Sequence, residues 1–136
     1  MKNILIIGGS SGVGEAITKK IAMNNNVIAT YQNNFKENTE NIEYREFDVI
    51  KNKPEKLEID GPLDSIVYCP GTINLKPFHR YSEEELIEDF NVNVIGFLKI
   101  LSFFKKNLLQ RENASVTLFS SVAAQKGIPF HTQVAC

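Results

Sequence analysis

The stretch Ile4-Leu5-Ile6-Ile7-Gly8-Gly9-Ser10-Ser11-Gly12-Val13-Gly14 decides how the rest of this 136-residue chain is interpreted. Four consecutive apolar residues that end in glycine are typical of a strand buried on both faces of a parallel sheet. A helix is predicted to follow from about Gly12 to Met23, with Val13, Ile17 and Ile21 spaced along one apolar stripe. The stretch therefore predicts a strand, a tight turn and a helix in direct succession.

The glycine-rich turn has the features of a pyrophosphate site. A pyrophosphate requires backbone N–H donors at a helix N-terminus and no side chains that block its close approach. Gly8, Gly12 and Gly14 supply this, and the hydroxyls of Ser10 and Ser11 are further donors. A P-loop is excluded, because Glu15-Ala16 stands where a lysine followed by serine or threonine is required. The context of strand, turn and helix predicts a dinucleotide-binding turn.

Further strands and helices alternate along the chain. A short helix is predicted at Pro54–Leu57, Ser82–Glu85 is a capping box, and a long helix is predicted from about Asn93 to Gln110. The crossover between the second and third strands is short and polar, so its helix should be reduced or absent. The alternation predicts a doubly wound α/β Rossmann fold with a parallel sheet of about five strands, incomplete on its C-terminal side, in a single domain over residues 1–136. The strands after the first are predicted at Val27–Thr30, Ile42–Val49, Ser65–Cys69 and Val116–Phe119.

The predicted long helix is apolar on more than one face. One face should pack on the sheet, and the rest is more apolar than solvation requires, which favours a homo-oligomer through the 93–110 helix. A wide core-facing helix in a monomer is the alternative. The apolar residues are Val94, Phe97, Leu98, Leu101 and Leu108 in one stripe, widened by Ile95, Ile100, Phe103 and Phe104.

Composition excludes several classes of protein. A formal net charge of -1 gives no basis for electrostatic capture of nucleic acid or of a membrane surface. Cys69 and Cys136 resemble neither a disulfide framework nor a metal site. The apolar run at Ile4–Ile7 is too short for a signal peptide or a membrane span. A cytoplasmic protein with no metal is the expectation.

The spacing Gly-x-x-x-Gly-x-Gly resembles that of the short-chain dehydrogenase/reductase family, and the resemblance extends along the whole chain. Asp48-Val49 resembles the pair that contacts adenine, and Tyr68-Cys69-Pro70-Gly71 stands where the family usually has Asn-Asn-Ala-Gly. Asn93-Val94-Ile95-Gly96 matches the family's asparagine motif. Phe119-Ser120-Ser121 matches the segment with the catalytic serine, for which Ser121 is the equivalent.

The resemblance implies an NAD(P)-dependent oxidoreductase that transfers hydride between the nicotinamide cofactor and a small alcohol or carbonyl substrate. Asn93 and Ser121 are the catalytic residues that it implies. Thr30–Asn33, at the end of the second strand, holds no carboxylate to repel a 2′-phosphate and Lys36 is nearby, so we expect NADP rather than NAD. The expected cofactor-binding residues are Gly8, Ser10, Ser11, Gly12, Val13, Gly14, Asp48, Val49, Cys69, Pro70 and Gly71.

The resemblance is incomplete at the proton donor. The family's tyrosine usually lies about thirteen residues beyond the serine, a position held here by Val134, and the lysine four residues further on would lie beyond Cys136. His131 is the remaining candidate acid near neutral pH. We expect either a longer product or another chain covering the sheet edge. The alternative function is a non-catalytic dinucleotide-binding module or an inactive truncated homologue.

Overall fold

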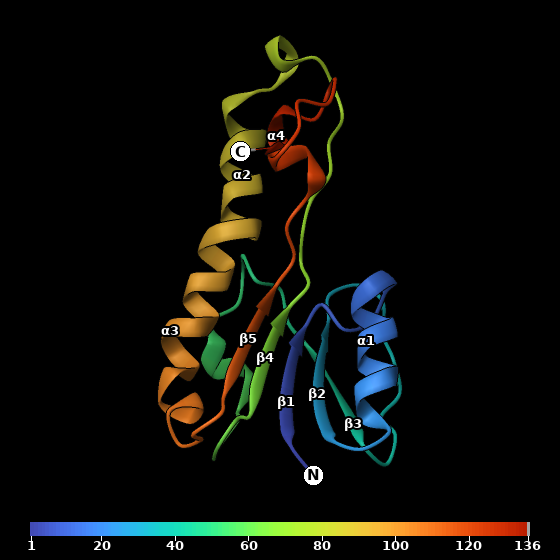
Figure 1. Ribbon diagram of the computed structural model, residues 1–136, viewed down its shortest axis with the longest axis vertical. Coiled ribbons are helices and arrows are strands. Elements are labelled where there is room, and N and C mark those ends of the chain that lie inside the picture. The colour runs from blue at the N-terminus through green and yellow to red at the C-terminus, as the bar shows by residue number, and fades with distance from the viewer. Residues whose placement is uncertain (136) are drawn as a thin grey trace.

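The computed structural model describes residues 1–135 as a five-stranded parallel sheet with helices on both faces (Figure 1). The strand order is β3-β2-β1-β4-β5, which confirms the predicted doubly wound α/β fold. Cys136, one of the two cysteines, lies outside the described residues. The strands are β1 (Asn3–Ile7), β2 (Asn26–Tyr31), β3 (Ile42–Glu46), β4 (Ser65–Tyr68) and β5 (Ser115–Leu118).

The helices form two layers around this sheet. α1 covers one face, whereas α3 and the 3-10 helix η1 cover the other (Figure 1). No helix lies between β2 and β3, as the short polar crossover predicted. The helical elements are α1 (Gly12–Ala22), η1 (Pro54–Leu57), η2 (Phe78–Arg80), α2 (Glu83–Phe90), the π-helical turn η3 (Asn91–Ile95), α3 (Gly96–Leu108), η4 (Val122–Ala124) and α4 (Thr132–Ala135).

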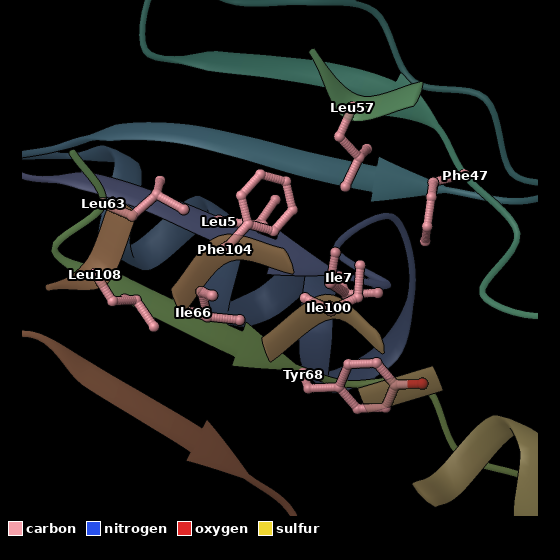
Figure 2. Packing of buried hydrophobic residues seen from close by; sticks show 10 residues of the cluster. All are labelled: Leu5, Ile7, Phe47, Leu57, Leu63, Ile66, Tyr68, Ile100, Phe104 and Leu108. Carbon is pink, nitrogen blue, oxygen red and sulfur yellow. The ribbon is translucent and has the colours of Figure 1, made fainter. Parts of the chain in front are cut away.

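The core consists of two clusters, one on each side of the sheet. Successive side chains of a strand point to opposite faces, so β1 contributes Leu5 and Ile7 to one cluster and Ile4 and Ile6 to the other. Figure 2 shows the first cluster, in which Phe104 of α3 packs over β1 and β4. Its buried members are Leu5, Ile7, Phe47, Leu57, Leu63, Ile66, Tyr68, Ile100, Phe104 and Leu108.

The face of α1 that meets the sheet differs from the predicted stripe. The buried residues are Gly14, Thr18 and Ala22, and the side chain of Val13 is 61% exposed. Ile17 and Ile21 pack at the side of the second cluster, as partly buried residues. The prediction was wrong at Val13 because α1 begins very close to β1. Only small side chains fit between the helix and the sheet.

The long helix begins earlier than predicted. The capping box is confirmed, since the Ser82 hydroxyl accepts a hydrogen bond from the amide of Glu85 and the Glu85 carboxylate accepts one from the amide of Ser82. From Glu83 the chain remains helical through the π-turn η3 to Leu108, so a start at Asn93 was wrong (Figure 1). The π-turn widens the helix locally without ending it.

The sheet ends in an exposed edge. All four residues of β5 are exposed, and within the described residues β5 pairs with β4 alone. Within residues 1–135, no helix has the length and apolar character needed to cross a membrane.

Candidate functional site

A cleft of about 630 Å³ lies at the carboxyl ends of β1, β2 and β4. Ligands of open α/β sheets bind at this end of the strands, where the strand order reverses. Among its lining residues are all those that the sequence singled out for cofactor binding: Gly8, Ser10, Ser11, Gly12, Val13, Gly14, Asp48, Val49, Cys69, Pro70 and Gly71.

The glycine turn forms one wall of the cleft. Gly8 and Gly12 adopt positive φ values of 76° and 52°, which L side chains rarely adopt. Gly14 lies so close to β1 that a Cβ atom there would overlap the carbonyl oxygen of Gly8. Ser11 precedes α1 without a side-chain capping bond, so the first amides of the helix keep their hydrogen-bonding capacity for a ligand. The turn therefore has the open approach and the available backbone donors that an anion site requires.

Two residues that the sequence analysis did not single out hold this turn in place. The Thr30 hydroxyl accepts a hydrogen bond from the amide of Gly8 at 2.8 Å, and its carbonyl oxygen accepts one from Gly9 at 2.9 Å. The side-chain Nδ2 of Asn34 donates to the carbonyl oxygen of Ser10 at 2.7 Å. Both follow from the parallel register, because the carboxyl end of β2 lies beside that of β1.

Asp48 closes the opposite wall through a dense set of hydrogen bonds. Its Oδ1 accepts from the amides of Ile50 at 2.8 Å and Lys51 at 3.1 Å, and its Oδ2 accepts from the side-chain amide of Gln32 at 2.9 Å. Burial alone raises the pKa of this carboxyl group, but the three donors and the nearby Lys51 ammonium outweigh it and lower the pKa. Asp48 is therefore ionised and fixed in direction at neutral pH.

Cys69-Pro70-Gly71 continues β4 along the third side. The Pro70 ring packs beside Gly8, at 3.3 Å from the position that a Gly8 Cβ would take. Burial raises the pKa of the Cys69 thiol to about 11, so this side chain is a neutral wall of the cleft at physiological pH. Thr72 and Val92 also line the cleft and were not predicted to do so, and Gln32 lines it within the Thr30–Asn33 segment from which the NADP preference was argued.

Asn93 lies beside the cleft rather than in its lining. Its side-chain amide donates to Oδ1 of Asp89 at 2.9 Å and to the Thr72 hydroxyl at 3.3 Å. Its Oδ1 lies 3.5 Å from the position of a Cβ at Gly71. Both amide protons are thus engaged, and Thr72 connects Asn93 to the cleft wall.

Ser121 follows β5 and caps the 3-10 helix η4. Its hydroxyl oxygen accepts from the amide of Ala123 at 3.1 Å, which leaves the hydroxyl proton free to be donated. Val134 lies half-buried in α4 and has no group that can donate a proton. Nδ1 of His131 lies 2.7 Å from the carbonyl oxygen of Pro129.

In the part of the chain that the structure describes, no group of three or more His, Cys, Asp or Glu side chains is arranged to hold a metal ion. A doubly wound parallel sheet with an uncapped, glycine-lined helix start at its switch point defines a Rossmann fold. The chain belongs to the short chain dehydrogenase family, whose model matches residues 2–133. This family is one of NAD(P)-dependent oxidoreductases.

Two curated relatives are similar over most of this chain. An uncharacterized oxidoreductase of Saccharomyces cerevisiae is 26% identical over an alignment of 132 positions, gaps included, that covers 89% of this chain and 43% of that protein. The L-rhamnose 1-dehydrogenase (NADP(+)) of Thermoplasma acidophilum is 26% identical over an alignment of 149 positions, gaps included, that covers 96% of this chain and 59% of that protein. The chain therefore spans about half the length of the curated relatives that it matches.

Solved structures share the fold at low sequence identity. The serine dehydrogenase of Escherichia coli superposes with a TM-score of 0.84 at 21% identity, covering 98% of this chain and 68% of that one. A short chain dehydrogenase family protein of Francisella tularensis has a TM-score of 0.83 at 22% identity, covering 99% of this chain and 57% of that one. ElxO with NADP bound has a TM-score of 0.83 at 21% identity, covering 99% of this chain and 62% of that one. These likenesses establish the fold.

Proposed function

We propose that residues 1–136 form a single domain, the dinucleotide-binding part of an oxidoreductase that acts on an alcohol or carbonyl substrate and prefers NADP to NAD. One observation carries the proposal: every residue expected to contact the cofactor lines the same cleft at the carboxyl ends of the strands. A reducing compartment such as the cytoplasm is part of the proposal, supported by the free thiol of Cys69 in the cleft wall.

The cleft fits a dinucleotide in shape and in chemistry. Backbone amides at the start of α1 would bind the pyrophosphate, because no side chain caps them and Gly14 leaves the approach open. Asp48 and Val49 would hold the adenine half of the cofactor. The wall formed by Pro70 and Gly71 would lie along its nicotinamide half. The bound cofactor would supply or accept a hydride at its nicotinamide ring.

Two residues have proposed roles toward the substrate. Ser121 would donate its hydroxyl proton to the substrate oxygen. This role is supported by the hydrogen bond from the Ala123 amide, which the Ser121 hydroxyl oxygen accepts without using its proton. Asn93 would support a proton-relay water, with its orientation held by Asp89 and Thr72. Val134 contributes no proton, so turnover requires another donor, for which His131 is the candidate within this chain.

The preference for NADP rests on the residues after β2. Gln32, Asn33 and Asn34 line the cleft there, and none of them carries a negative charge that would repel a 2′-phosphate. Lys36 follows shortly after these residues in the chain, and its ammonium group lies 3.2 Å from the Glu15 carboxylate on α1. One curated relative carries NADP(+) in its name, and one similar structure contains NADP.

Cofactor titration tests the binding proposal. The chain has no tryptophan, so the nicotinamide fluorescence of NADPH and NADH can be followed without interference from tryptophan. We expect NADPH to bind more tightly than NADH. Lys36→Met should weaken the binding of NADPH but not that of NADH. Lys19→Met removes the other ion-pair partner of Glu15 and is the matched control. A folded protein that binds neither cofactor overturns the proposal, and tighter binding of NADH overturns the preference.

Turnover is a separate test. The protein is assayed with NADP(H) and a panel of alcohols and carbonyl compounds, together with Ser121→Ala and His131→Gln. We expect slow oxidation or reduction that Ser121→Ala abolishes without changing the Kd for NADPH. Binding without any turnover would remove the oxidoreductase proposal for this chain and leave a dinucleotide-binding module.

A further inference from the structure

Lys99 reaches from α3 to the loop that closes the adenine side of the cleft. Its Nζ donates hydrogen bonds to the carbonyl oxygens of Val49 at 3.0 Å and Asn52 at 3.3 Å. Lys99 itself does not line the cleft. Its side chain instead lines an apolar hollow between α3 and η1, with Leu98 and Pro54. Any effect of Lys99 on a bound ligand therefore passes through the loop.

The loop formed by residues 48–52 is a tight turn closed mostly on itself. The amide of Asn52 donates to the carbonyl oxygen of Asp48 at 2.9 Å, and the amide of Asp48 donates to Oδ1 of Asn52 at 2.8 Å. Beyond these internal bonds, the loop is held by the side chains of Gln32, Lys56 and Lys99. Of these three residues, Lys99 is the one that connects the loop to α3.

One peptide group is held at both ends in this arrangement. The peptide between Val49 and Ile50 directs its carbonyl oxygen to Lys99 and its N–H to the carboxylate of Asp48, at 2.8 Å. Because a peptide group is planar, fixing its carbonyl oxygen also fixes the direction of its N–H. Lys99 thereby helps to set the position of the Asp48 carboxylate.

The charge of Lys99 strengthens this connection. Hydrogen bonds from an ammonium group to a carbonyl oxygen are about twice as strong as those between neutral groups. Among residues 1–135, no carboxylate lies within 4.0 Å of this ammonium group, so its protein partners are the two loop carbonyls. The small residue Gly96 lets α3 approach the loop, with Val49 at 3.1 Å from the position of a Gly96 Cβ.

We propose that Lys99 is a positioning residue for the adenine half of the cofactor, acting through the Val49–Ile50 peptide on Asp48. This inference rests on the proposed dinucleotide-binding function. It predicts that a change outside the cleft, on the opposite side of the loop, weakens binding of the adenine half.

The test uses Lys99→Met, which keeps the apolar stem along the hollow and removes the charge and the donors. We expect the Kd values for NADPH and for adenosine 2′,5′-bisphosphate to rise by the same factor, about tenfold, which corresponds to about 1.4 kcal/mol. Lys99→Arg keeps a cationic donor and should restore most of the binding. Lys105→Met, at an exposed position on the same helix, is the matched control and should leave both Kd values unchanged.

A spectroscopic readout separates positioning from general destabilisation. The amide proton of Ile50, hydrogen-bonded to a carboxylate, should shift upfield in Lys99→Met and return in Lys99→Arg, while resonances of α1 stay in place. Wild-type Kd values and an unmoved Ile50 resonance in Lys99→Met overturn the inference. If the wild-type protein binds neither ligand, the proposed function fails first and the inference fails with it. The two failures are thus distinguishable.

Discussion

Replacing Gly14 by alanine would place a methyl carbon onto the carbonyl oxygen of Gly8. The new Cβ would also lie 3.3 Å from Cβ of Cys69, which directly follows β4. A flexible side chain can rotate away from such a methyl group, but the Gly8 carbonyl belongs to the backbone of the turn. Thr30 holds this turn through the amides of Gly8 and Gly9, so α1 is the part that has to move.

The expected loss of folding free energy depends on which atoms overlap. Inserting a methyl group into a well-packed contact costs about 1–3 kcal/mol, and the overlap with backbone places Gly14→Ala at the upper end. In a domain of this size, each kcal/mol corresponds to a fall in Tm of roughly 4 °C, so Tm should fall by roughly 12 °C. Displacement of α1 also moves the amides of Val13 and Gly14 away from the pyrophosphate position. We expect NADPH binding to weaken by more than tenfold.

Thermal and urea unfolding followed by circular dichroism, with NADPH titration, measure both effects. Gly127→Ala is the matched control, because a Cβ at Gly127 meets nothing within 4 Å and its φ is not positive. Gly12→Ala isolates backbone strain, since its surroundings are open but its φ is 52°; about 1 kcal/mol is expected. A Gly14→Ala protein with wild-type Tm and wild-type Kd would refute the close approach of α1 to β1.

Three further predictions concern the long helix. The hydrogen bond from Lys76 lowers the pKa of Glu85 to about 2 from an ordinary 4.5, so the stability that it contributes is present above pH 4.5 and lost as pH falls toward 2. Glu85→Gln should therefore flatten the dependence of Tm on pH between 5 and 3, and parallel curves would contradict this. Tyr68→Phe leaves the carbonyl oxygen of Val92 without its 2.5 Å hydrogen bond and should cost about 1–2 kcal/mol in urea unfolding; an unchanged midpoint speaks against that bond. If the exposed apolar face of α3 joins two subunits, Leu98→Glu should lower the mass measured by sedimentation velocity, and a wild-type oligomer in the variant would exclude this contact.

The features predictable from sequence were those encoded by short local signals. The apolar run at Ile4–Ile7, the glycine turn and the capping box at Ser82 each follow from the conformation of a few neighbouring residues. The cofactor-binding residues beyond the glycine turn were predicted from the resemblance to the short-chain dehydrogenase/reductase family, and the parallel strands bring their carboxyl ends to one edge of the sheet. Residues far apart in the chain, such as Asp48 and Gly71, thereby line the same cleft.

Features that depend on the distance between elements could not be predicted in this way. Helical periodicity placed Val13 in the core, but the approach of α1 to β1 selects Gly14 and Thr18 for the contact. The apolar residues of the long helix offered several possible faces, and the choice of Ile100 and Phe104 depends on where β1 and β4 lie. The hydrogen bond between Thr30 and the glycine turn is likewise a contact between strands. The sequence analysis considered Thr30 only because its segment carries no carboxylate.

Gly96 shows how these distances connect the fold with the site. A Cβ at this position would lie 2.5 Å from the Tyr68 hydroxyl and 3.1 Å from Cβ of Val49, so glycine permits the helix to touch both β4 and the loop after β3. The Tyr68 hydroxyl donates to the carbonyl oxygen of Val92 inside the π-turn, where burial keeps the hydroxyl protonated by raising its pKa. Asn93 follows directly in the same turn. The close contact at Gly96 thus holds three parts of the site, the adenine-side loop, the end of β4 and the asparagine, in one fixed relation.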